Sequence, residues 1–239
     1  MKIDPEKCIC CLSCIDFCPM DCILEGDEEV TIDQDECVEC GVCLRANVCP
    51  VEAIYMPEES HEYPRSLRAA FSDPGVKFPE VNQGGRGTEE MKTNDVTGKF
   101  RQGQYGMTLE FGRPGVGTRI AEIEKVTKAL CPVGVNLEKA NPVYSLLEDK
   151  ETGKMKPEVL QEKVLSAILE FKIQESQLKE VVNMLIPLLE QINTVVSWGL
   201  VTRFAEDGTL PARSKLKDLG ILVRPNAKIN MGLGRPIVE

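Results

Sequence analysis

Residues 8–19 read CICCLSCIDFCP and residues 37–50 read CVECGVCLRANVCP. Each stretch places three cysteines at two-residue gaps and a fourth directly before a proline, so eight of the chain's eleven cysteines fall into two matching runs. The runs differ in the last gap, which is three residues long before Cys18 and five before Cys49. Few chemistries need eight thiolates so closely spaced.

This spacing is typical of the ligands of iron–sulfur clusters. Three cysteines at short gaps can wrap one corner of a four-iron cube, while the proline-linked fourth cysteine reaches the cluster of the other run. The pattern therefore predicts two [4Fe-4S] clusters with crossed ligands. One set is Cys8, Cys11, Cys14 and Cys49, and the other set is Cys37, Cys40, Cys43 and Cys18.

Two other cysteine chemistries fit the sequence less well. Zinc sites usually pair two CxxC hooks across a longer loop, which leaves the third cysteine of each run without a role. A disulfide framework needs an oxidising compartment, and no signal-peptide pattern precedes Cys8. We therefore expect a reducing, anaerobic cytoplasm as the setting.

The duplication extends beyond the cysteines. Ile3-Asp4 precedes the first run as Ile32-Asp33 precedes the second, and residues 20–23 correspond to residues 51–54. Residues 1–56 thus form two copies of a unit of about thirty residues. Each copy is expected to contain a short strand, a cysteine loop, a short helix near the Cys-Pro pair and a returning strand. Since neither copy has the apolar side chains for a core, bound clusters would hold the fold together.

Residues 1–56, about a quarter of the chain, resemble a bacterial-type ferredoxin domain with two [4Fe-4S] clusters. The remaining residues carry no recognised family pattern. The resemblance implies one-electron transfer at low potential, with two clusters close enough to exchange electrons. The five-residue gap before Cys49 departs from the usual gap of three, which puts the geometry around that cysteine in question.

Three cysteines lie outside the predicted ligand sets. Cys10 and Cys22 correspond to Glu39 and Ala53 in the second copy, so neither position requires a thiol. We expect Cys22 to be a small buried side chain behind a cluster. Cys131 stands alone before a proline and is expected to be a packed free thiol.

The charge is concentrated in the N-terminal quarter. Residues 1–56 contain thirteen Asp and Glu against three basic residues, which accounts for the whole chain's net charge of −10. Oxidised clusters with four thiolates each would add about two further negative charges per cluster. Such a body is expected to dock on a basic protein surface and to avoid nucleic acid. No apolar run reaches the length of a membrane span.

Residues 57–106 lack a sustained period of a helix or a strand. They contain prolines at 57, 64, 74 and 79 and several glycines, among them the Gly84-Gly85-Arg86-Gly87 segment. We predict an extended connector that is mobile or wraps a partner. The glycine-rich segment could cradle a phosphate or a carboxylate, although it matches no specific phosphate loop. His61, the single histidine, has no ligand pattern around it.

Residues 107–204 are patterned as a second domain of mixed helix and strand. We predict strands at 107–112, 143–148, 168–174 and 194–204, a helix with Thr118 as its N-cap, and helices starting at Pro157 and at Glu175. Pro187 should bend the last helix. This order resembles a split βαβ plan, that is, a ferredoxin-like α/β sandwich, a fold unrelated to iron–sulfur ferredoxins. The predicted class of the whole chain is α+β, and an all-helical 157–192 is the main alternative.

Two further segments have possible binding roles. The glycine-rich turn at 112–118 leads from a strand into a helix, where backbone N–H groups favour anions, and Arg113 and Arg119 flank it. Short turns also carry glycine for conformational reasons alone. Residues 205–239 are expected to form a tail that docks on a partner.

Three hypotheses of function remain. The leading one is an electron-transfer subunit of a larger anaerobic oxidoreductase, which docks on a catalytic redox subunit as a hetero-oligomer and has no substrate chemistry of its own. The second is a redox-sensing and ligand-sensing module with a small-anion site in the C-terminal domain. The third is an enzyme that uses the clusters and the glycine-rich connector at a shared site.

Overall fold

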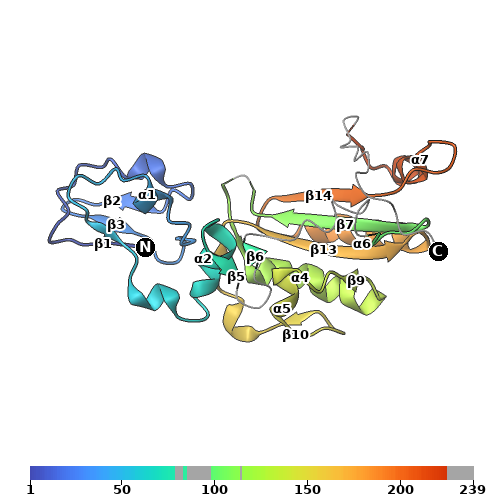
Figure 1. The fold of residues 1–239 in the computed structure, drawn as a ribbon, viewed down its shortest axis with the longest axis horizontal. Coiled ribbons are helices and arrows are strands. Elements are labelled where there is room, and N and C mark those ends of the chain that lie inside the picture. Colours follow the sequence, from blue (N-terminus) through green and yellow to red (C-terminus); the bar gives the residue numbers. More distant parts are fainter. Residues whose placement is uncertain (79–82, 85–97, 114, 225–239) are drawn as a thin grey trace.

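The structure has an N-terminal part of short strands and loops and a C-terminal part built on a larger sheet (Figure 1). It is a computed structural model that describes residues 1–78, 83–84, 98–113 and 115–224. The chain is therefore a mixture of helices and strands, as the sequence predicts. No helix among these residues is long and apolar enough to cross a membrane.

The N-terminal part is built from two small antiparallel strand pairs, and each pair joins one copy of the repeat to the other. The first strand of copy one pairs with the last strand of copy two, and the last strand of copy one pairs with the first strand of copy two. Exchanging the copies therefore maps one pair onto the other. The pairs are β1 (Lys2–Ile3) with β4 (Ile54–Tyr55), and β2 (Ile23–Glu25) with β3 (Val30–Ile32).

The short helices of the two copies end before the Cys-Pro pairs, where the sequence predicts that they start, and the second contains Cys43. They are the 3-10 helix η1 (Ile15–Phe17) and the helix α1 (Val42–Arg45). The core between them is small, and cysteines make up a large share of it. Its buried members are Met1, Cys22, Ile23, Val30, Ile32, Cys37, Cys43 and Ile54. A core of this size supports little stability without a staple such as a bound metal group.

The C-terminal part contains a four-stranded antiparallel sheet in the order β14-β7-β13-β9. The two central strands pair along their full length, from Gln104 opposite Gln174 to Phe111 opposite Ala167. The strands are β7 (Gln104–Phe111), β9 (Asn136–Leu137), β13 (Ala167–Gln174) and β14 (Val196–Val201). The predicted strands at 107–112 and 168–174 are confirmed, and the strand predicted at 194–204 is shorter than expected.

Two helices, α4 (Ile120–Leu130) and α6 (Leu178–Leu189), pack together against this sheet. Each turns an apolar stripe inward at helical spacing, as the sequence predicts. The stripe of α4 consists of Ile120, Ile123, Val126 and Leu130, all fully buried. Pro187 lies in the last turn of α6 and has no N–H to donate to the carbonyl four residues earlier.

Smaller elements surround the sheet. The helical ones are η2 (Glu58–His61), η4 (Cys131–Val133), α5 (Pro142–Ser145), η5 (Pro157–Val159), η6 (Glu175–Gln177) and α7 (Pro211–Asp218). The extended ones are β5 (Lys77–Phe78), β6 (Gln83–Gly84), β8 (Thr118–Arg119), β10 (Leu147–Asp149), β11 (Lys154–Met155) and β12 (Lys163–Val164).

Three local predictions are corrected. The helix predicted from Pro157 is only a 3-10 turn, because Lys163–Val164 leaves the helical path to pair with Thr118–Arg119 as a strand. The strand predicted at 143–148 is correct only for residues 147–148, which lie in β10. Residues 143–145 lie in the helix α5, whose first turn is capped by the Asn141 side chain accepting from the Val143 N–H at 2.8 Å. Thr118 lies in β8, so α4 begins later than predicted, after Arg119.

The connector predicted at 57–106 differs from the structure over much of its length. Residues 66–72 form the helix α2 (Ser66–Ser72), and strand β7 already begins at Gln104. Leu67, Phe71 and Phe78 lie in the core of the C-terminal part, where the two phenylalanine rings meet edge to face at 5.2 Å. Residues 66–78 therefore belong structurally to the C-terminal part, since their apolar side chains complete its core.

Helix α2 also fastens the C-terminal part to the second cysteine loop (Figure 1). The Arg68 guanidinium is buried, pairs with Glu162 at 2.5 Å, and donates to the carbonyl oxygens of Gln34 at 2.9 Å and Cys37 at 2.8 Å. Glu36 pairs with Lys163 and, at 3.2 Å, with Arg119. These contacts place the two parts in a defined mutual position.

We expect Arg68→Gln to lower the free energy of unfolding by about 3 kcal/mol, because it leaves Glu162 without its buried partner. Denaturant unfolding of the anoxically purified full chain measures this loss. The matched control is Lys154→Gln in the exposed Lys154–Glu148 pair, which should leave the free energy of unfolding nearly unchanged because solvent screens that pair. Equal losses in both variants would contradict a special role for Arg68.

Candidate functional site

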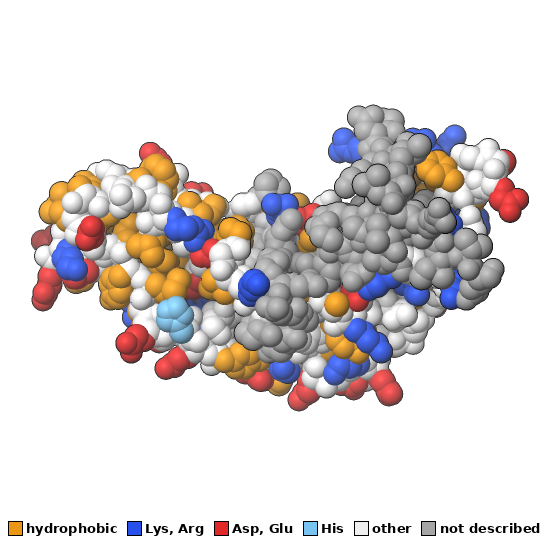
Figure 2. All heavy atoms as spheres, viewed as in Figure 1, with side chains coloured by type: hydrophobic (Ala, Val, Ile, Leu, Met, Phe, Trp, Pro, Cys, Tyr) orange, Lys and Arg blue, Asp and Glu red, His pale blue; other side chains and the backbone are white. Residues whose placement is uncertain are grey.

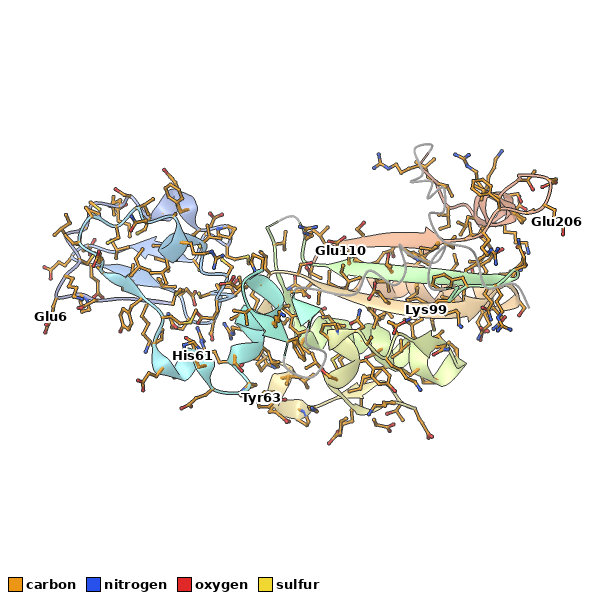
Figure 3. All side chains as sticks on the ribbon, viewed as in Figure 1. Glu6, His61, Tyr63, Lys99, Glu110 and Glu206 are labelled. Atoms are coloured by element: carbon orange, nitrogen blue, oxygen red, sulfur yellow. The ribbon has the colours of Figure 1, made fainter. Side chains whose placement is uncertain are left out.

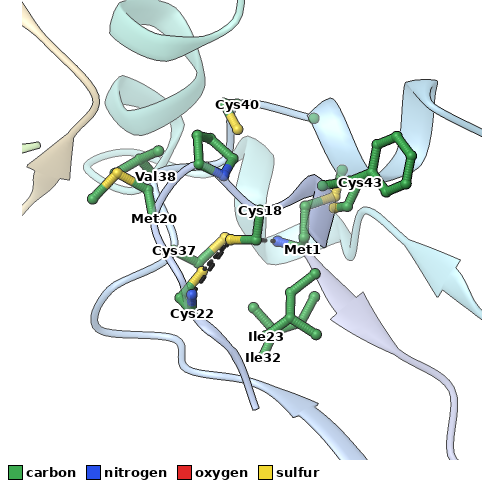
Figure 4. A pocket seen from close by; sticks show the side chains of 13 residues that line it. Met1, Cys18, Met20, Cys22, Ile23, Ile32, Cys37, Val38, Cys40 and Cys43 are labelled. Carbon is green, nitrogen blue, oxygen red and sulfur yellow. Dashed lines mark hydrogen bonds between the residues drawn. The ribbon is translucent and has the colours of Figure 1, made fainter. Parts of the chain in front are cut away.

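Two cavities in the N-terminal part are lined by cysteines from both runs. The outer pocket is lined by Cys8, Cys11, Cys14 and Cys49 and spans about 320 Å³ of space, part of it open to solvent. The inner pocket is lined by Cys18, Cys37, Cys40 and Cys43, together with Cys22, and spans about 310 Å³, also partly open to solvent (Figure 4). Each pocket thus gathers three cysteines of one run and the proline-linked cysteine of the other.

The remaining walls of both pockets are almost entirely apolar. The outer pocket is closed by Ile3, Ile9, Leu12, Val30, Val51, Ala53 and Ile54. The inner pocket is closed by Met1, Phe17, Pro19, Met20, Ile23, Ile32, Val38 and Gly41. A thiolate-lined cavity in apolar surroundings suits a soft metal group and gives hard cations no oxygen ligands.

The cysteine loops share an unusual backbone. Cys10 and Leu12 in the first loop have φ of 52° and 60°, and the corresponding Glu39 and Gly41 in the second have 53° and 67°. Left-handed residues that alternate along a loop turn successive N–H groups toward one side, which creates the nests found around anions and iron–sulfur groups. A non-glycine residue in this region costs about 1–2 kcal/mol, so three such residues in two short loops point to a functional site.

The two proline-linked cysteines make equivalent hydrogen bonds. The Ala53 N–H donates to Cys49 Sγ at 3.2 Å, and the Cys22 N–H donates to Cys18 Sγ at 3.4 Å. The donor lies four residues after the acceptor in both cases. The five-residue gap before Cys49 therefore leaves its local contact the same as that of Cys18.

Cys22 differs from the other cysteines of the inner pocket (Figure 4). Its Sγ lies 3.4 Å from Cys18 Sγ. Hydrogen bonding by Cys22 lowers the pKa of Cys18 and of Cys37, whereas the same bonds raise the pKa of Cys22. Cys22 is thus the thiol that keeps its proton, and it is buried as the sequence predicts.

Burial disfavours the thiolate form of other pocket cysteines, in contrast to the hydrogen bonds that favour it at Cys18 and Cys37. It raises the pKa of the Cys43 thiol to about 11 and also raises the pKa of Cys14 and Cys40. By contrast, a hydrogen bond from the Ser13 side chain lowers the pKa of Cys11, which is exposed. Because metals bind thiolates, loading the buried positions has to release protons.

Cationic side chains that the sequence did not single out support the second loop. Arg45 donates to the Cys40 carbonyl at 2.6 Å, and Arg68 donates to the Cys37 carbonyl. Glu39, which is fully buried, accepts from Arg65 at 2.6 Å and pairs with the N-terminal ammonium. Isolated arginines in a sequence carry no sign of such contacts, because most arginines lie in solvent.

The donor set of both pockets fits an iron–sulfur group. All eleven cysteines lie in the described part of the chain, and none forms a disulfide. Within the described residues, no three His, Cys, Asp or Glu side chains are arranged to hold a single metal ion. The sulfur donors instead surround a cavity, which suits a polynuclear cluster held by four thiolates.

The other positions that the sequence singles out do not line either cysteine pocket. His61 and Cys10 are exposed, and Cys131 is half-buried next to α4 (Figure 3 labels His61). In the turn that leads to β8, Arg113 pairs with Glu110 at 3.1 Å, and Gly117 has a φ of +70°. The left-handed backbone therefore accounts for glycine at that position. The glycine-rich segment of the connector lies mostly outside the described residues.

Comparison with known proteins finds ferredoxins. A protein named Ferredoxin 7Fe from Hydrogenibacillus schlegelii is 46% identical over 63 residues, which cover 25% of this chain and 78% of the relative. A ferredoxin from Streptomyces griseus is 46% identical over 67 residues, covering 26% of this chain and 62% of the relative. Ferredoxin-1 from Caulobacter vibrioides is 31% identical over 100 residues, covering 41% and 86%.

No family model and no solved structure matches the chain. The relatives define the class: the N-terminal part is a ferredoxin segment, which confirms the resemblance seen in the sequence. The chain belongs to the ferredoxin family through this segment, and iron–sulfur binding with electron transfer is its general function. The rest of the chain extends beyond these matches.

We expect Gly41→Ala to weaken the inner pocket. The φ of Gly41 is +67°, and a Cβ there would lie 2.6 Å from Arg45 Nη1, so the side chain that supports the Cys40 carbonyl has to move. Gly134→Ala is the matched control, because its φ is +74° but its Cβ would meet nothing within 4 Å. Both variants should lose about 1 kcal/mol of stability from the left-handed backbone. Only Gly41→Ala should also lose iron faster under anoxic dialysis, and equal rates of loss would contradict this.

Proposed function

We propose that this chain transfers electrons through two [4Fe-4S] clusters as the iron–sulfur subunit of a larger oxidoreductase complex. The observation that carries the proposal is the pair of cysteine pockets, each completed by a cysteine from the other run. Such clusters, when bound, accept and release single electrons at low potential.

The chain's own residues would bind and insulate these groups. We propose Cys8, Cys11, Cys14 and Cys49 as ligands in the outer pocket and Cys37, Cys40, Cys43 and Cys18 in the inner pocket. The apolar walls shield the buried sulfur atoms of Cys37 and Cys43 from water, and the N–H groups of Ala53 and Cys22 direct hydrogen bonds at Cys49 and Cys18. Hydrogen bonds of this kind stabilise negative charge on sulfur.

A docking role would account for the rest of the chain. The sheet order β14-β7-β13-β9, with α4 and α6 packed against it, supports a ferredoxin-like split βαβ sandwich. The N-terminal part carries the whole net charge of −10, which favours a catalytic redox subunit with a basic surface in a reducing, cytoplasmic setting. Arg113 and Arg119 already have carboxylate partners, which does not favour the alternative of an anion sensor.

The iron count tests the clusters directly. Anoxically purified protein should contain about eight iron and eight acid-labile sulfide per chain, as two four-iron clusters require. One relative is named Ferredoxin 7Fe, so a count of seven is the sharpest competing outcome. Seven iron would refute the four-iron assignment of one pocket, and zinc without sulfide would refute the whole proposal.

Replacing one proline-linked cysteine tests the crossing. We expect Cys49→Ser to damage the cluster bound with Cys8, Cys11 and Cys14, and Cys18→Ser to damage the other one. Electron paramagnetic resonance of the reduced variants distinguishes the two signals, with Cys131→Ser as the control. If Cys49→Ser removed only the signal that Cys40→Ser also removes, the assignment of ligands would be wrong.

The subunit role needs its own experiment. Affinity purification of the full chain under strict anoxia, followed by mass spectrometry, should recover a redox enzyme subunit in stoichiometric amount. A chain that stays monomeric at native expression level and passes electrons only to soluble carriers would contradict the proposal of a permanent complex.

A further inference from the structure

The two cysteine loops have the same backbone but opposite exposure. Ile9 in the first loop is 60% exposed, whereas the corresponding Val38 in the second loop is 1% exposed. Cys10 is exposed, whereas the corresponding Glu39 is fully buried. The loops share their cysteine spacing and their backbone, so the difference in exposure reflects what packs against each of them.

That feature is the segment that leads into the C-terminal part. Ser60, Arg65, Arg68 and Asp73 all lie in residues 58–73 and all contact the second loop or its ion-paired side chains. Ser60, Arg68 and Asp73 are themselves buried by this contact. The chain therefore covers the edge of its own inner pocket.

The first loop is bordered by acidic side chains instead. The turn between β2 and β3 lies beside it, since Cys10 Sγ approaches the Glu28 carbonyl at 3.6 Å. Glu25, Asp27, Glu28 and Glu29 on this turn are all exposed. Figure 2 shows hydrophobic side chains over the N-terminal part with acidic side chains along its outer rim. The surface formed by residues 9–13 and 25–29, here called the outer face, thus exposes the apolar side chain of Ile9 beside an acidic border.

We propose that electrons enter or leave the chain at the outer face, through contact with a one-electron redox protein that has an apolar contact patch bordered by lysine and arginine. This rests on the proposed function and adds the site of exchange. Apolar contact at the centre of an interface excludes water, while opposite charges at its rim raise the association rate. The exchange moves one electron between the chain and its partner, and no covalent bond forms or breaks.

A basic c-type cytochrome is a suitable probe for this surface. The reduced full-length holoprotein is mixed anoxically with the ferric cytochrome, each transferred electron makes one haem ferrous, and haem absorbance follows the reaction. At about 0.1 M salt, where the Debye length is about 10 Å, we expect Glu28→Lys to lower the second-order rate constant by at least about threefold.

The matched control for Glu28→Lys is Glu206→Lys. It makes the same change in net charge at an exposed position at the opposite end of the molecule from Glu6 (Figure 3). Its rate should stay close to that of the unmodified chain. Ile9→Ala should also slow the reaction, whereas Leu44→Ala, an exposed apolar truncation on the second copy, should not. Equal effects of Glu28→Lys and Glu206→Lys would overturn the outer face as the site of exchange.

Cross-linking gives a second readout that does not depend on electron transfer. A zero-length carbodiimide joins carboxylates of one protein to lysines of another, so it reports which acidic residues face the cytochrome. We expect cross-linked peptides from residues 24–30. Cross-links confined to carboxylates of the C-terminal part would overturn the proposal.

Different results refute the proposed function and the proposed site of electron exchange. A preparation without iron and sulfide, or one that dithionite does not reduce, refutes the proposed function, and the exchange site falls with it. A preparation whose clusters reduce normally, but whose cytochrome rate is unchanged by Glu28→Lys and Ile9→Ala, refutes the outer face alone.

Discussion

Each cysteine pocket is completed by a sulfur atom from the other half of the repeat, and the N-terminal part depends on this exchange. Cys49 closes the outer pocket and Cys18 closes the inner one. The strand pairs cross between the halves in the same way, but they are only two or three residues long. Strand pairs of this length are weak alone, so neither half is expected to fold without the other.

The two cysteine loops that line the pockets have strained backbone conformations. Cys10, Leu12 and Glu39 adopt left-handed conformations that disfavour side chains, and this conformation turns N–H groups toward one side of the loop. The small core around Met1 and Ile54 offsets little of that strain. A group that binds all four sulfurs of a pocket would supply the missing stability, as metal binding does in other small domains.

Helix α2 connects the N-terminal part to the C-terminal part, because its side chains contact both. Its apolar side chains, among them Phe71, complete the core of the C-terminal part, and its Arg68 holds the carbonyl of Cys37. The same contact covers the inner pocket and leaves the outer one exposed. A repeat with matching cysteine runs thereby acquires two ends that differ in exposure.

The element predictions succeeded where the hydrophobic pattern was long. The strand at Ala167–Gln174 and the helix at Ile120–Leu130 bury apolar residues at regular intervals, and such periods are visible without tertiary information. The helix predicted from Pro157 failed because a two-residue strand pairing, which no local pattern signals, determines the path of Lys163–Val164. The seven-residue helix α2 was missed for a related reason, since it lies between Pro64 and Pro74 in a segment without a sustained period.

The two cysteine runs, their duplication, the acidity around them and the resemblance to ferredoxins can all be read from the chain itself, because ligand spacing and charge are local properties. The burial of Arg68 and Glu39, the entry of residues 66–78 into the C-terminal core and the unequal exposure of the two loops become visible only in the folded molecule. These outcomes depend on contacts between residues far apart in the chain, such as Arg68 with Glu162, and a residue's type alone does not specify its distant partner.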